Sequence, residues 1–152
     1  MTPEVRALVH QARLGFVASV NADGSPNVSP KGTVRVWDDD HLIFADLESP
    51  GTVRNVSRDP RVEVNVVDPI LRKGYRFRGR ARVVSSGPEL ERAVAFYSNG
   101  PDDVRSEAGP SIRAVVLIEV DEVRPLISPG YRGGISEADM RRRWLDHYAR
   151  ED

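Results

Sequence analysis

Short runs of alternating apolar and polar residues dominate the chain and predict β-strands separated by turns. Val62, Val64 and Val66 alternate with polar residues, which predicts a strand with one buried face. The run 41–47 is almost wholly apolar and predicts a largely buried strand. Gly, Pro, Asn and Asp clusters separate the runs and predict hairpin turns. Altogether the pattern predicts about six strands, at 14–21, 27–36, 41–47, 61–67, 75–85 and 112–123.

Apolar residues at helical spacing predict helices between these strands. Thr2 and Ser136 precede the first and last of them as N-caps, and proline stands at the first helical position after Thr2 and after Ser49. The predicted helices cover 3–13, the short segment after Ser49-Pro50, the segment opened by Gly87-Pro88, and 137 to about 150.

The order of these elements predicts a small antiparallel barrel. The strands are mostly connected as hairpins and lack the regular strand-helix alternation of a parallel sheet. A closed arrangement of six strands leaves no exposed sheet edge. We therefore expect a single domain over 1–152, with an N-terminal helix at 1–13, the barrel with its short helices at 14–125, and a C-terminal helix at 136–150.

The amino-acid composition excludes several kinds of functional site. The chain has 152 residues, enough for one core, and no cysteine, which excludes disulfides, thiolate nucleophiles and cysteine-ligated metals. Its three histidines are far apart in sequence, so no metal site is expected. The apolar runs are too short for a membrane span, and the first residues do not resemble a signal segment. We expect a cytoplasmic protein without membrane contact.

Arginine supplies nearly all of the positive charge. There are 20 arginines and two lysines, but the net charge of −1 argues against a nucleic-acid partner. Four arginines line one face of the strand at 75–85: Arg76, Arg78, Arg80 and Arg82. This face also lacks the aromatic residues that single-strand binders use. Two interpretations stay open: an anionic cofactor or dimer contact, or a solvated face paired with Glu63, Asp68 or Glu119.

Several segments resemble, in the same order, the pyridoxamine 5′-phosphate oxidase-like family of FMN-binding split barrels. They are GSPNVSPKG at 24–32, LIFAD at 42–46, SPGTVRN at 49–55, DPRV at 59–62 and YRFRGRA at 75–81. The resemblance covers roughly residues 5–125. It implies a mainly β fold with peripheral helices, a six-stranded antiparallel split β-barrel. It also implies a homodimer that holds FMN at the subunit interface and acts on a small molecule.

The phosphate of FMN needs positive charge, hydroxyls and the free N–H groups of a helix start. The segment from Ser49 to Thr52 offers these, with Arg54 one turn on and Lys31 on the preceding hairpin. These residues also have plainer interpretations: Ser49 as an ordinary helix N-cap, Arg54 as an exposed helix arginine and Lys31 as a solvated edge lysine. The resemblance implies the cofactor-binding residues Lys31, Gly32, Thr33, Ala45, Asp46, Ser49, Thr52, Arg54, Arg76 and Arg78.

Two departures from the family pattern argue against vitamin B6 oxidation. An ungapped match places Gly51 and Thr52 where true pyridoxamine phosphate oxidases carry an Arg-Lys pair, and the C-terminal Arg-x-His element is missing. We expect an FMN-dependent oxidoreductase with an unknown small substrate and no assigned catalytic residue. A deazaflavin coenzyme could replace FMN. The alternative function is a non-catalytic flavin-, deazaflavin- or haem-binding protein on the same fold.

Overall fold

The computed structural model describes residues 1–47, 50–99 and 112–150. The elements in chain order are α1 (Pro3–Ala12), β1 (Gly15–Val20), β2 (Pro26–Lys31), β3 (Arg35–Val36), β4 (His41–Asp46), α2 (Pro50–Arg58), β5 (Arg61–Asp68), β6 (Lys73–Val84), α3 (Gly87–Asn99), β7 (Ala114–Ile127), the 3-10 helix η1 (Pro129–Gly133) and α5 (Glu137–Tyr148).

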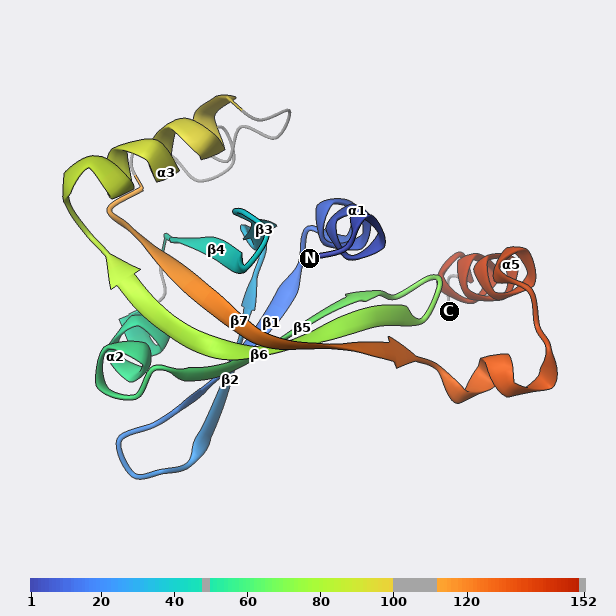
Figure 1. The fold of residues 1–152 in the computed structure, drawn as a ribbon. Helices are drawn as coiled ribbons and strands as arrows, with labels where there is room; N and C mark the ends of the chain where they lie inside the picture. The colour runs from blue at the N-terminus through green and yellow to red at the C-terminus, as the bar shows by residue number, and fades with distance from the viewer. Residues whose placement is uncertain (48–49, 100–111, 151–152) are drawn as a thin grey trace.

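The strands form one antiparallel sheet in the order β2-β1-β5-β6-β7-β4-β3. The long strands β6 and β7 run through the middle of the molecule, from α3 at one end to α5 at the other (Figure 1). Strands β2 and β3 follow each other in the chain yet occupy opposite edges of the sheet, which curves into a half-barrel. The prediction of a mainly β, antiparallel split barrel with peripheral helices is confirmed.

The prediction of six strands needs one correction, because the extended run at 27–36 is two strands. Strand β2 pairs only with β1, and β3 pairs only with β4. The chain must therefore cross from one sheet edge to the other, and it does so at residues 32–34. The described residues thus form seven strands.

The predicted helices are present, with small differences at their ends. The Thr2 hydroxyl accepts a hydrogen bond from the Val5 amide at 3.4 Å, and the Ser136 hydroxyl accepts one from the Asp139 amide at 3.1 Å. The C-terminal helix α5 ends at Tyr148 rather than near residue 150. Among the helices in the described ranges, none is long and apolar enough to cross a membrane.

Strand β4 is buried on both faces, which explains its almost unbroken apolar sequence. Leu42 and Phe44 belong to the main core inside the half-barrel, where α1 and α2 also contribute. Ile43 and Ala45 face a second core formed with β7 and α3, which includes Tyr97. The end of β4 is therefore held between two packed layers, and the candidate site lies at this end.

Candidate functional site

Lys31 ends β2 and is only 6% exposed, so it is not the solvated edge lysine of the plainer interpretation. Its ammonium group donates a short hydrogen bond to the Ser29 hydroxyl and lies 5.8 Å from the centre of the Phe44 ring. Burial lowers the pKa of Lys31, and the nearby Asp46 carboxylate opposes that shift. The fold thus keeps a desolvated cation close to the end of β4.

Thr33 and Ala45 are joined by a pair of side-chain hydrogen bonds. The Ala45 amide donates to the Thr33 hydroxyl at 3.0 Å, and this hydroxyl donates to the Ala45 carbonyl at 3.3 Å. The carbonyl of Thr33 accepts a further bond from the Tyr97 hydroxyl at 2.8 Å. Both Thr33 and Tyr97 are buried. These contacts fix the crossing segment 32–34 against β4 and α3.

The other predicted phosphate-binding residues differ in their exposure to solvent. Thr52 is buried, whereas Arg54 is exposed, as its plainer interpretation held. Gly32 is exposed in the turn after β2, and its carbonyl accepts a hydrogen bond from the Arg35 guanidinium at 3.1 Å. The predicted contribution of Ser49 lies outside the described residues.

Arg76 and Arg78 do not join this group within one chain. Both are exposed on β6, and the Arg76 guanidinium lies 3.7 Å from the Glu63 carboxylate, as the solvated-face interpretation anticipated. On β7, the residue paired with Arg78 lies eight positions from the residue paired with Asp46, roughly 25 Å along an extended strand. Their role in cofactor binding stays a prediction.

Sequence reasoning missed the contribution of Tyr97. Its spacing along α3 marks it as part of an apolar helix face, and it is indeed 2% exposed. A buried tyrosine hydroxyl still requires a hydrogen-bond partner, and that requirement is the only signal that the sequence offers. The partner, the Thr33 carbonyl, lies 64 residues away in the chain.

The residues present fit a phosphate-bearing cofactor. A lysine ammonium has three N–H donors, and the described contacts of Lys31 use one of them, toward Ser29. A buried cation with unused donors suits an anionic ligand. The first turn of α2, at Gly51 and Thr52, follows soon after the end of β4 and carries free backbone N–H groups. This group can bind and orient an anion.

Comparison with known proteins places the chain in a family. Residues 1–126 match the family model described as pyridoxamine 5′-phosphate oxidase. No curated protein matched. A crystal structure of HupZ from Group A Streptococcus is 30% identical, with a TM-score of 0.72, and the match covers 84% of this chain and 95% of that one.

Two further solved structures share the fold at lower identity. One is a pyridoxamine 5′-phosphate oxidase-related, FMN-binding protein from Nostoc punctiforme PCC 73102, at 18% identity and a TM-score of 0.66, covering 88% of this chain and 86% of that one. The other is an F420 reductase, at 19% identity and a TM-score of 0.60, covering 82% and 98%. With the family match over most of its length, this chain belongs to the pyridoxamine 5′-phosphate oxidase family.

Proposed function

We propose that the protein is a flavin-dependent oxidoreductase that uses FMN to oxidise or reduce a small molecule. The observation that carries the proposal is the buried Lys31 ammonium, which uses one of its three donors in the described contacts and lies near the Asp46 carboxylate, in a chain of this family. Lys31 and the first turn of α2 would hold the phosphate, while Thr33 and Ala45 fix the backbone beside it. The flavin supplies the hydride-transfer chemistry when bound.

The names of the structural neighbours support a flavin or a deazaflavin. One neighbour is described as FMN-binding and another as an F420 reductase. Because the sequence identity to both neighbours is low, the choice between the two cofactors rests on the residues of this chain. We favour FMN because Lys31 is the single buried cation among the described residues, and one cation matches one phosphate group better than a long anionic tail.

We further propose that the single domain over residues 1–152 works as a cytoplasmic homodimer. Arg76 and Arg78 are exposed on β6, whereas Lys31 is buried. In such a dimer these two arginines would reach the cofactor held near Lys31 of the other copy. Sedimentation at micromolar concentration tests this proposal, because a species of only 16.9 kDa contradicts it.

The test of FMN binding uses the two lysines of the chain as a matched pair. Lys31→Met removes the buried ammonium, whereas Lys73→Met removes a partly exposed one that pairs with Glu137. We expect Lys31→Met to weaken FMN binding by about 10- to 100-fold, since it removes charged hydrogen bonds to phosphate. Riboflavin, which has no phosphate, should lose far less affinity, and Lys73→Met should change neither.

The absorption spectrum decides between the possible cofactors and between the two classes of function. Titration of the purified protein with FMN and with a deazaflavin coenzyme, followed between 350 and 500 nm, reports which cofactor binds. An oxidoreductase passes electrons from its reduced, bound cofactor to small acceptors faster than the free cofactor does. A carrier binds the same cofactor without that acceleration. Failure to bind either cofactor would contradict the proposal.

A further inference from the structure

An open groove runs along the outer surface where the β1–β2 hairpin, the end of α2 and strands β5 and β6 meet. It consists of two adjoining hollows of about 460 and 760 Å³. The two hollows share Val20, Gly24, Arg61 and Arg80. Of the candidate flavin residues Arg78 lines the larger hollow, whereas Lys31, Thr33, Ala45, Asp46 and Thr52 line neither, so the groove is distinct from the cluster around Lys31.

Four arginines from three elements line this groove: Arg58, Arg61, Arg78 and Arg80. Arg61 of β5 stands directly opposite Arg80 of β6 in the strand register. Like charges in directly opposite positions destabilise a sheet. Asp59 pairs with Arg61 and offsets part of that repulsion, and an anion bound between the two arginines would offset more of it.

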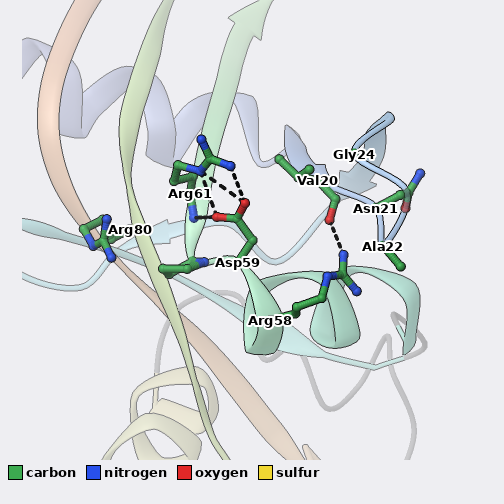
Figure 2. A pocket seen from close by; sticks show the side chains of 9 residues that line it. Val20, Asn21, Ala22, Gly24, Arg58, Asp59, Arg61 and Arg80 are labelled. Atoms are coloured by element: carbon green, nitrogen blue, oxygen red, sulfur yellow. Dashed lines mark hydrogen bonds and ion pairs between the residues drawn. The ribbon is translucent and has the colours of Figure 1, made fainter.

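Hydrogen bonds to neighbouring residues hold the side chains of Arg58 and Arg61 in place. Arg61 donates three hydrogen bonds to the two carboxylate oxygens of Asp59, at 2.5 to 3.1 Å. Arg58 donates to the Val20 carbonyl at 2.7 Å on the opposite side of the hollow (Figure 2). Both guanidinium groups are therefore oriented before any ligand arrives, which lowers the entropic cost of binding.

A buried polar network stiffens the wall of the groove. The Asn55 side-chain amide donates to the Ser19 hydroxyl at 3.1 Å and to the Asn21 side-chain oxygen at 2.9 Å. Asn55 and Ser19 are 5% and 4% exposed. These bonds tie the β1–β2 hairpin to α2 and so keep Arg58 at a fixed place relative to Val20.

Arg78 and Arg80 make no direct ion pair among the described residues, although the strand register places Glu63 and Glu122 opposite Arg78 and Glu119 opposite Arg80. Both are exposed, and within residues 1–47, 50–99 and 112–150 neither makes a hydrogen bond or an ion pair. Beside them, the larger hollow is lined by the apolar side chains of Ala18, Val20 and Pro26 and by the carboxylates of Glu63 and Asp121. The groove therefore offers guanidinium groups without a direct partner among the described residues, next to an apolar strip and two carboxylates.

We propose that this groove binds a small phosphate-bearing molecule with an apolar body, with the phosphate between Arg61 and Arg80 and the body over Ala18 and Val20. Guanidinium groups match the geometry of phosphate oxygens, and a hollow of this volume accommodates a ligand larger than the phosphate alone. The site goes beyond the proposed flavin chemistry and does not depend on it.

The test uses phenyl phosphate and inorganic phosphate as probes of the full-length protein, followed by backbone amide NMR. We expect phenyl phosphate to shift the amide signals of Val20, Val62 and Gly79 and to bind several-fold more tightly than inorganic phosphate, because only the former covers the side chains of Ala18 and Val20. Arg80→Gln should weaken phenyl phosphate binding about tenfold, through the loss of a charged hydrogen bond. Arg141→Gln, an exposed change on α5, should leave binding unaltered.

Two results would overturn this proposal. One is the absence of shifts at the groove amides over the titration. The other is equal weakening by Arg80→Gln and Arg141→Gln, which would indicate a general charge effect. The Lys31→Met variant separates this site from the flavin site: it should keep its response to phenyl phosphate at the groove even where it has lost affinity for FMN.

Discussion

The hydroxyl of Thr33 replaces a missing strand partner, and its removal gives the sharpest test of how the candidate site is held together. In the register of β3 and β4, Arg35 pairs with Ile43 and Val36 with Leu42. Extended toward the N-terminus, the same register places Thr33 opposite Ala45, before β3 begins. The Thr33 side chain there bonds both the amide and the carbonyl of Ala45, as a neighbouring backbone would.

Thr33→Val keeps the shape of this side chain and removes both hydrogen bonds. The Ala45 amide and carbonyl are then left without this partner in a region where Ala45 is 2% exposed. An unsatisfied buried polar group costs about 1 to 3 kcal/mol. For the two groups together we expect a loss of about 3 kcal/mol in the free energy of unfolding. For a chain of this size, such a loss lowers the Tm by roughly 10 °C.

Urea and thermal unfolding followed by circular dichroism measure this effect, at one protein concentration and without added cofactor. Thr33→Ser keeps the hydroxyl and serves as the matched control, with an expected loss below about 1 kcal/mol. The reasoning is refuted if Thr33→Val unfolds within about 0.5 kcal/mol of the wild type. It is also refuted if the serine variant is destabilised as much as the valine variant.

Three further results follow from particular contacts. Gly79→Ala would place a Cβ 2.0 Å from the Glu119 carbonyl oxygen and should cost at least about 3 kcal/mol in urea unfolding, whereas Gly133→Ala has open space and should be nearly neutral. Because Arg61 lowers the pKa of Asp59 to about 2, this pair stabilises the fold above about pH 4 and loses that contribution as the pH falls toward 2. A carboxyl-carbon NMR titration of Asp59 should show that midpoint, and Arg61→Gln should raise it. Thr52→Ala should weaken FMN by about 1 to 3 kcal/mol and riboflavin far less, with Thr52→Ser as control; equal losses would show that Thr52 does not serve the phosphate.

Strands in which buried and exposed positions alternate regularly were predictable from the sequence. Strand β5 buries Val62, Val64 and Val66 as their alternation predicts, because a sheet with one packed face selects apolar residues at every second position. The exposed arginines on β6 follow from the same rule. The N-caps at Thr2 and Ser136 depend only on residues within one turn, so local sequence defines them as well.

Features that depend on distant partners were not predictable. The run at 27–36 has a continuous extended pattern, and only the pairing of its two halves with β1 and β4 shows that the chain crosses between sheet edges. Lys31 precedes a glycine in a hairpin, a setting typical of a solvated lysine. Its burial arises from Phe44 and Asp46, which lie on another strand.

The crossing segment explains why the candidate site is found at this end of the sheet. A half-barrel whose edge strands are consecutive in sequence must pass the chain across its opening, and the backbone groups there have no ladder partner. The Thr33 hydroxyl and the Tyr97 hydroxyl satisfy them, and so polar side chains are drawn into a buried region. A lysine in that region carries a desolvation cost that an aliphatic residue would avoid, and Asp46 only partly offsets it. We infer that Lys31 serves recognition of an anion rather than stability, and Lys31→Met should therefore unfold no more easily than the wild type while it loses affinity for FMN.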